Sequence, residues 1–346
     1  MIKNLLALAM VQSLLLADGP APMQTPTFLP GEPLKNGEVP AGYPIPSQVK
    51  LAAGPDIYVT GNFLYWNGST LDDQVGTKNN ADKTRSSRLF FASEYRPGFR
   101  VGAGYDANIM LFDFVWTRYH HEMTSHFSAH GTDTLTPNAA IIGEEFSTLP
   151  DFKQLKSRWQ LHYDDFLITG QKNIFARPKF ILNACYGIDG LFMSQHMNIQ
   201  ATTPGTSATG LVKAGHKLWS IGPFIGMRLR ALMPWNFRII GKIDFNLNYS
   251  RIYKGNFVLA FPTVPGNTFA NNTQKYARPA SEYLTKAESG IGIDWNCYLA
   301  KDHLRLAIMA TYDVVTIFNF GPALYEAFLM GNTYFHGLTL GGRLDF

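Results

Sequence analysis

The stretch FRIIGKIDFNLNYS, from Phe237 to Ser250, alternates between apolar and polar residues, with Ile240 as the one apolar residue out of phase. Side chains of a β-strand point to opposite faces in turn, so this pattern predicts a strand with one apolar and one polar face. A globular strand usually has about 5–6 residues, whereas a tilted strand that crosses a bilayer needs about 9–11. The length favours a membrane strand, although a soluble β-sandwich can show the same alternation.

Recurrence of the pattern decides between these alternatives. Short connections, such as Met233 to Asn236 and Ala300 to His303, alternate with long polar ones, such as 124–156, 202–216 and 261–281. Outer-membrane barrels are built in this way, usually with an even number of strands. The sequence therefore predicts an all-β protein, a transmembrane antiparallel up-and-down β-barrel of about twelve strands, with ten to fourteen allowed. Strands are expected at 58–66, 99–105, 109–119, 159–170, 180–192, 218–230, 237–250, 291–297, 304–312 and 334–346, with weaker ones near Phe257 and Leu284.

The bulk composition fits a barrel. The 346 residues are 46% hydrophobic and 14% aromatic, and aromatic girdles at two membrane interfaces would use that supply. A large all-β core is the other structure that could use so many aromatic residues. The net charge is only +4 and the basic residues are dispersed, so no nucleic-acid partner is expected.

The N-terminus has the features of a secretory signal. Lys3 is followed by an apolar stretch to Leu16, and Ala17 is the candidate for the last residue before cleavage. A short amphipathic helix or a lipid-facing anchor is the alternative. Residues 18–56 carry nine prolines and are expected to form a flexible segment before the barrel. We therefore expect a signal peptide at 1–17, a Pro-rich segment at 18–56 and a barrel at 57–346.

The two cysteines fall on opposite faces of their predicted strands. Cys185 shares its parity with Asn183 and Asp189, which are polar, whereas Cys297 shares its parity with Ile293 and Trp295, which are apolar. We therefore expect no disulfide between them.

Several motifs resemble one family of outer-membrane proteins. They are FLYW at 63–66, GFRVGAGYD at 98–106, WTRYH at 116–120, WQL at 159–161 and WSIGP at 219–223. Together they resemble the Legionella major outer membrane protein-like family, which is also abundant in environmental relatives of chlamydiae. The resemblance runs from about Tyr58 to Phe346 and implies a pore-forming β-barrel in the bacterial outer membrane.

The C-terminus resembles the signal that outer-membrane assembly machinery reads. Phe346 ends a strand in which Leu338, Leu340 and Leu344 share its parity. We expect this strand to contact the assembly machinery and outer-membrane lipid. Whether the barrel is a monomer or a homo-oligomer stays open.

Candidate chemical sites in the chain are weak. His120, His121, His126 and His130 lie close to Glu122, but their spacing fits no closed zinc site, and exposed loop histidines are the simpler interpretation. Asp164 and Asp165 are adjacent in a strand and point to opposite faces. Gly102-x-Gly104 lacks the third glycine of a dinucleotide fingerprint, and small residues beside bulky aromatics explain it better. No enzyme, metal or cofactor is predicted.

The predicted polar face would line the barrel lumen. Mixed charges there predict a hydrated pore for small hydrophilic solutes and ions, with weak charge selectivity. Two alternatives stay open: the charges pair and plug a narrow barrel, or the protein is a structural or adhesive surface barrel without a useful pore. The inferred pore-lining residues are Arg100, Arg228, Arg230, Arg238, Lys242, Arg305, Arg343, Asp106, Asp113, Asp189, Asp244, Glu288, Asp294, Asp313 and Asp345.

Overall fold

The fold was examined in a computed structural model of the whole chain. The structure describes residues 56–346 except 71–73, 81, 83, 108–109, 138–151, 178, 206–208, 261–271, 276–279, 300–303 and 319–331. The expected signal peptide and nearly all of the Pro-rich segment lie outside the described residues, so both stay predictions. The turn expected at 300–303 lies outside them as well.

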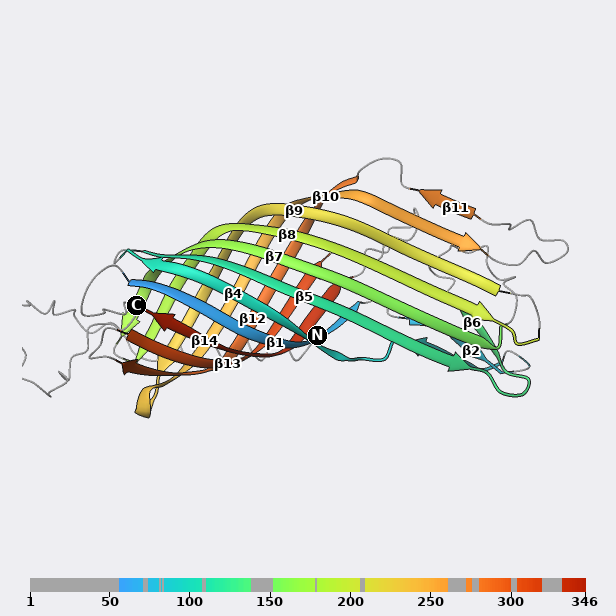
Figure 1. Cartoon of the computed structure of the whole chain (residues 1–346), viewed down its shortest axis with the longest axis horizontal. Coiled ribbons are helices and arrows are strands. Elements are labelled where there is room, and N and C mark those ends of the chain that lie inside the picture. Colours follow the sequence, from blue (N-terminus) through green and yellow to red (C-terminus); the bar gives the residue numbers. More distant parts are fainter. Residues whose placement is uncertain are drawn as a thin grey trace, which may run out of the picture. The chain divides into compact units, whose positions relative to one another are not determined.

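Ten antiparallel strands of the described chain pair in a closed ring (Figure 1). Each strand pairs with the next in the ring, β10 also pairs with β9, and β14 closes against β1 through the register Phe63 to Leu340. The expected all-β, antiparallel up-and-down barrel is confirmed. The ring strands are β1 (Asp56–Thr70), β4 (Tyr95–Asp106), β5 (Leu111–Ser128), β7 (Gln154–Arg177), β8 (Phe180–Thr202), β9 (Thr209–Leu232), β10 (Phe237–Ala260), β12 (Ala280–Leu299), β13 (Leu304–Phe318) and β14 (Thr333–Asp345).

The strand number is ten, at the lower end of the expected range. The weak strands expected near Phe257 and Leu284 are not separate membrane strands. Phe257 lies in the outer half of β10, and Leu284 lies in the first half of β12, the strand that also contains the expected 291–297. The surplus of two came from counting each of these two long strands twice.

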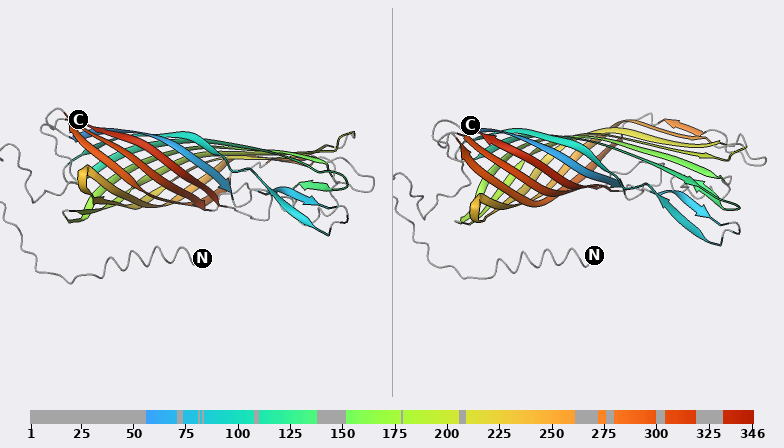
Figure 2. Two further views of the ribbon diagram at one scale, coloured as in Figure 1. Left: turned by 90° about the horizontal axis from the view of Figure 1, so that it is seen from below. Right: turned by 60° about the horizontal axis from the view of Figure 1, so that its bottom comes forward.

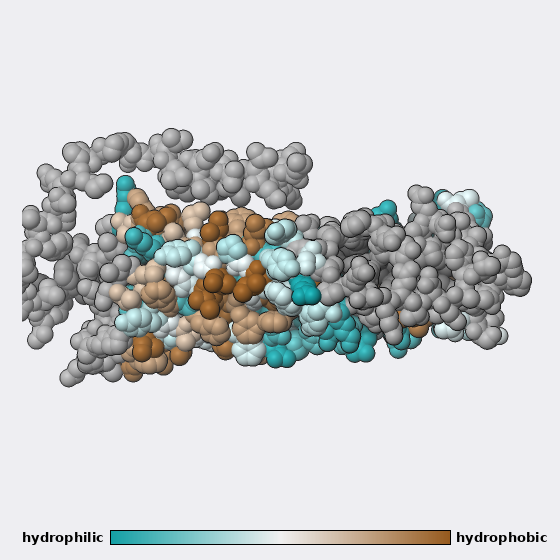
Figure 3. Space-filling model, turned by 90° about the horizontal axis from the view of Figure 1, so that it is seen from above, coloured by the Kyte–Doolittle hydropathy of each residue, from teal (hydrophilic) through white to brown (hydrophobic). Residues whose placement is uncertain are grey.

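The exterior of the barrel carries the apolar face of each strand. Ile225 is 64% exposed and Ile291 is 66% exposed, and bulky apolar side chains are exposed on the other strands of the ring as well. Figure 3 shows apolar side chains over one stretch of this exterior and hydrophilic side chains beside it. An apolar band with polar flanks is how a barrel meets a bilayer.

Five neighbouring strands, β5 and β7 to β10, continue well past the others. β7, β9 and β10 each have 24 residues and β8 has 23, whereas β4 has 12 and β14 has 13. Figure 2 shows the long strands running beyond the short ones. The sequence interpretation was wrong about the long polar connections, because parts of 124–156, 202–216 and 261–281 are strand.

A small second sheet packs against these extensions. It consists of β3 (Ser86–Phe90), β2 (Gln74–Asn79) and β6 (Thr134–Pro137), in that order. Val75 and Leu135 from this sheet join one apolar cluster with Leu155 of β7 and Ile199 of β8, all at most 1% exposed. β11 (Asn272–Lys275) pairs with the outer end of β10.

The short connections lie at the other end of the barrel. A single 3-10 turn, Pro234–Asn236, joins β9 to β10 as expected. Trp235 and Asn236 adopt positive φ angles of 61° and 64°, a conformation that lets the chain reverse within few residues. No helix in the described part of the chain is long and apolar enough to cross a membrane.

The cysteines occupy opposite faces, as their parity predicted. Cys185 is buried inside the barrel, and Cys297 is half-buried on the exterior; both are free. We expect non-reducing peptide mapping of the purified protein to recover the two cysteines in separate peptides. A cross-linked Cys185–Cys297 peptide would mean that the register of β8 or β12 is wrong.

Candidate functional site

Every residue expected to line the lumen lies on the inner face of its strand. The alternation that makes Phe245 53% exposed leaves Asp244, its neighbour, 2% exposed. The inner face is not simply a wet surface, because most of these charges are paired across or along the wall. Buried within it are Arg238, Arg305, Asp106, Asp189, Asp244, Glu288, Asp294, Asp313 and Asp345, and half-buried are Arg100, Arg228, Arg230, Lys242, Arg343 and Asp113.

Near the short turns, paired charges fix one wall of the barrel. The Arg238 guanidinium donates from Nε to Asp294 Oδ1 at 2.7 Å and from Nη2 to Asp294 Oδ2 at 2.6 Å. Arg305 Nη1 lies 3.3 Å from Asp345 Oδ2, and Arg343 Nε donates to Asp345 Oδ1 at 2.8 Å. Two-point arginine pairs of this kind hold both side chains in one orientation.

A second group of charges crosses the lumen. Arg100, on β4, places Nη2 2.9 Å from Glu288 Oε1 of β12 and Nη1 3.5 Å from Asp313 Oδ2 of β13. Lys242 Nζ lies 2.5 Å from the same Glu288 oxygen and 3.1 Å from Asp313 Oδ1. Three strands separate β4 from β12 in the ring, so Arg100 bridges one wall to another.

Lys242 does not pair with Asp244, although the two residues lie two positions apart on the inner face of β10. Asp244 instead pairs with Arg228 on the adjacent β9. The two strands are in register at Lys242 and Arg228, and Asp244 stands opposite Gly226. A side chain at position 226 would collide with the Asp244 carboxylate, so Gly226 leaves room for that carboxylate beside Arg228.

A third bridge was missed at the sequence level. Lys286 of β12 is 2% exposed and lies 2.6 Å from Asp165 Oδ1 of β7 and 2.5 Å from Asp189 Oδ1 of β8. Asn248 Nδ2 donates to the other Asp189 oxygen at 2.5 Å. The parity of Lys286 with Glu288 was the available signal, but the strand around Leu284 was too weakly patterned to assign its faces.

Beyond these bridges the inner face changes from polar to aromatic. Trp66, Tyr119, Tyr163 and Phe335 come from four strands, are at most 1% exposed, and are named here the aromatic layer. Phe335 stands at its centre, with ring centroids 5.1 Å from Tyr163, 5.5 Å from Tyr119 and 6.3 Å from Trp66. The Tyr119 hydroxyl donates to the Trp66 carbonyl at 2.7 Å. The layer closes the described lumen on the side of the strand extensions.

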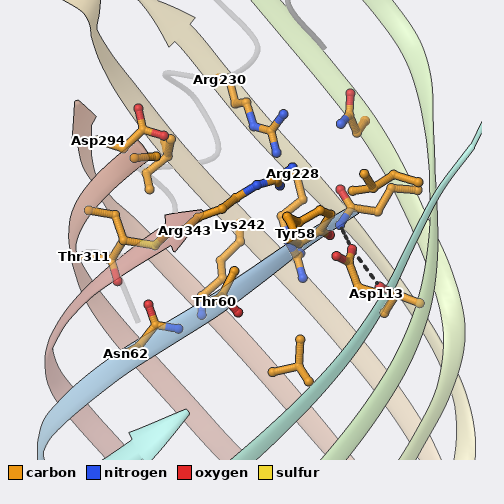
Figure 4. A pocket seen from close by; sticks show the side chains of 18 of the residues that line it. Tyr58, Thr60, Asn62, Asp113, Arg228, Arg230, Lys242, Asp294, Thr311 and Arg343 are labelled. Atoms are coloured by element: carbon orange, nitrogen blue, oxygen red, sulfur yellow. Dashed lines mark hydrogen bonds between the residues drawn. The ribbon is translucent and has the colours of Figure 1, made fainter. Parts of the chain in front are cut away.

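On the other side of the bridges lies a chamber of about 270 Å³ (Figure 4). It is lined by residues from the end of the barrel that carries the short turns, including Arg230 of β9, Arg343 of β14 and Asp113 of β5. Seven basic and three acidic residues line the chamber among those described. Tyr58 forms part of its wall and lies under the Arg343 guanidinium, whose Cζ is 3.4 Å from the ring centroid. A Cβ atom at Gly104 would collide with that phenol ring, as the sequence explanation expects, whereas a Cβ atom at Gly102 would meet the Phe114 carbonyl oxygen and the Thr60 hydroxyl instead of an aromatic ring.

The side chains of the histidine segment do not gather at one site. His120 points outward and meets His162 edge to face with ring centroids 4.4 Å apart, whereas His121 points inward and shares a 2.8 Å hydrogen bond with the Tyr119 hydroxyl. Burial, with a smaller effect from Arg96, lowers the pKa of His121 to about 4. Glu122 pairs with Arg158 at 2.8 Å on the outer surface. No group of three or more metal-ligating acids, histidines or cysteines gathers within the described residues.

Comparison with known proteins establishes the family. The family model described as the Legionella pneumophila major outer membrane protein precursor matches residues 55–345. The chain belongs to this family. It is therefore a bacterial outer-membrane protein, and the apolar exterior of its barrel contacts lipid. The match begins where β1 begins, so the family region and the barrel coincide.

Solved barrels show only distant likeness. The outer membrane protease OmpT from Escherichia coli is 8% identical with a TM-score of 0.43, covering 87% of this chain and 99% of its own. The translocator domain of autotransporter NalP from Neisseria meningitidis is 9% identical with a TM-score of 0.34, covering 85% and 90%. A Pseudomonas aeruginosa FadL homologue is 6% identical with a TM-score of 0.25, covering 84% and 90%. No curated protein matches the chain.

Proposed function

We propose that this protein is a porin through which small hydrophilic solutes and ions cross the outer membrane by passive diffusion. The polar chamber inside the closed ring carries the proposal, because a space of about 270 Å³ lined with charged residues is what a route for hydrophilic solutes requires. The expected pore-lining residues form the chamber wall and the bridges beyond it. Pairing of most of those charges supports weak selectivity between cations and anions, although basic residues outnumber acidic ones in the chamber lining.

The constriction of this route is the aromatic layer together with the Lys286 bridge. Solutes must pass groups that are at most 4% exposed, so passage depends on movement of these side chains. Conductance is therefore expected to be small for a barrel of ten strands. A lumen filled by side chains is usual for barrels with few strands, whereas porins of 16–18 strands leave an open channel.

A structural surface barrel without a pore is the second candidate. The observation that favours it is the same aromatic layer, continuous with an apolar cluster that extends to the small sheet. In this alternative the chamber is a closed vestibule and the strand extensions serve as an external platform. The protein would then need no movement of the layer at all.

Planar bilayer recording of Phe335→Ala separates the two candidates. Wild type is expected to give small channels, and Phe335→Ala is expected to enlarge them because it removes the central ring of the aromatic layer. Leu338→Ala is the matched control, since Leu338 lies on the same strand but is 41% exposed on the lipid side. Silence from both folded wild type and folded Phe335→Ala would favour the structural barrel.

Charge reversal at the chamber must avoid the paired residues. Arg238 and Lys242 are unsuitable because glutamate there would face Asp294 or Glu288 in a buried setting. Arg230 lies within ion-pair distance of no acid in the part of the chain that the structure describes, so Arg230→Glu is the better probe of selectivity. It is expected to move the reversal potential toward cation preference.

A further inference from the structure

The basic residues that line the chamber differ in whether they have an acidic partner. Arg238 is paired with Asp294, Arg228 with Asp244, and Lys242 with Glu288 and Asp313. Arg343 and Arg305 share Asp345. Each of these acids compensates a cation at its own wall, and none of them is left over for another partner.

Arg230 is the exception. Among the residues that the structure describes, no acid lies within ion-pair distance of its guanidinium and no side chain or carbonyl accepts from it. Its strand neighbour Ile240 on β10 is apolar, and so is Ile181 on β8. Figure 4 shows Arg230 pointing into the chamber toward the space that Arg228 and Arg343 also enter.

Asp113, an acid in the chamber lining, is held by neutral hydrogen-bond donors and not by an ion pair. Its carboxylate accepts from the Thr169 hydroxyl at 3.3 Å and from the Gln171 amide. These donors come from β7, on the chamber wall next to β5, and they hold the carboxylate there. Asp113 therefore stays at the β5 wall, where neutral donors bind it. The excess of positive charge lies at the β9 and β14 walls.

From this arrangement we infer that the chamber contains a binding site for a phosphate group, centred on Arg230 and completed by Arg228 and Arg343. The inference rests on the proposed function, because the chamber lies on the proposed solute route. Guanidinium groups bind oxyanions by two parallel N–H donors, and an arginine without an acid keeps both donors available. Three guanidiniums from different directions suit a tetrahedral oxyanion better than a planar carboxylate, and the partly buried wall strengthens each contact.

The size of the chamber limits the ligand. A volume of about 270 Å³ lies just below the range of about 300–1,000 Å³ that is typical of pockets for drug-sized ligands. It accommodates inorganic phosphate or the phosphate end of a small solute. The site thus gives the proposed pore a preference among hydrophilic solutes that weak overall charge selectivity would not provide.

Direct binding of inorganic phosphate tests the site. Full-length protein refolded in detergent at low ionic strength is titrated with phosphate and followed by calorimetry and by ³¹P line width. Wild type is expected to show saturable binding that Arg230→Gln weakens tenfold or more and Arg230→Lys weakens less. Arg177→Gln is the matched control, because Arg177 is an exposed arginine at the same end of the barrel, outside the chamber. Heat-modifiable mobility on gels verifies that each variant is folded.

Three results would overturn the site: no saturable binding by wild type, equal affinity in Arg230→Gln, or equal affinity of wild type for acetate and phosphate. Bilayer recording of the same preparations keeps this inference separate from the proposed function. Wild type that conducts without binding phosphate overturns the site alone. Wild type that binds phosphate without conducting supports the site and overturns the pore.

Discussion

Replacing Lys286 with alanine is expected to lower the free energy of unfolding by about 3–5 kcal/mol. Lys286 is the only described cation that contacts both Asp165 and Asp189, and both carboxylates are nearly inaccessible to water. Without the ammonium group, two buried acids remain close together with no compensating charge. Denaturant unfolding of the protein in lipid vesicles, followed by tryptophan fluorescence, measures the loss.

A compensated variant distinguishes loss of the charge from loss of packing. Lys286→Met combined with Asp165→Asn and Asp189→Asn removes all three charges and keeps their volume, and it is expected to recover most of the stability. Lys254→Ala, at an exposed lysine on β10, should change the stability by less than about 0.5 kcal/mol. If Lys286→Ala were as stable as Lys254→Ala, the bridge across the lumen would contribute nothing.

Placing a charge on the lipid side of the last strand is expected to have the second large effect. Leu340 is 44% exposed on the exterior of β14, opposite Phe63 of β1 and Ala310 of β13. Arginine in the middle of a membrane strand costs about 2–4 kcal/mol, a large part of a total stability of about 5–15 kcal/mol. Leu340→Arg should therefore reduce the heat-modifiable barrel in the outer-membrane fraction severalfold, while Leu340→Phe should leave it unchanged.

The proposed role of the C-terminus in assembly is tested in the same assay. Phe346 donates to the Ile57 carbonyl at 2.9 Å and accepts from the Ile57 amide at 3.2 Å, which extends the closure of β14 on β1. Deleting Phe346 should cause protein to accumulate in the periplasm or be degraded. Normal amounts of folded barrel after both changes would contradict the lipid assignment of Leu340 and the assembly role of Phe346.

The faces of the strands were predictable because alternation is a local property. The alternation at 237–250 is enough to predict which side chains point inward, and the structure places Asp244 inside and Phe245 outside as the pattern requires. The partners of the charges were not predictable. Arg100 meets Glu288 only because the ring closes and brings β4 opposite β12, and no feature within either strand encodes that distance.

The full length of the strands was not predicted from the sequence. In β7 the inward residues Trp159 and Leu161 are apolar, whereas further along the outward residues Phe166 and Ile168 are apolar. The apolar face thus changes sides where the strand leaves the bilayer, since water then lies outside the wall and the apolar core lies inside it. The expected strand at 159–170 spans this change of phase, and the parts of β7 that were missed are the largely polar flanks 154–158 and 171–177.

The strand extensions give this barrel a feature that the bilayer region lacks, namely free sheet edges. Beyond Tyr119, β5 has no β4 partner, and beyond Ile252, β10 has no β12 partner, so the outer part is an open sheet. Open edges invite strand addition from other chains. Short β11 covers one edge, and on the other Arg96 Nε donates to the Glu122 carbonyl at 3.2 Å. A barrel confined to the bilayer never meets this hazard of self-association, whereas this chain must resist it in water, where neighbouring copies can meet edge to edge.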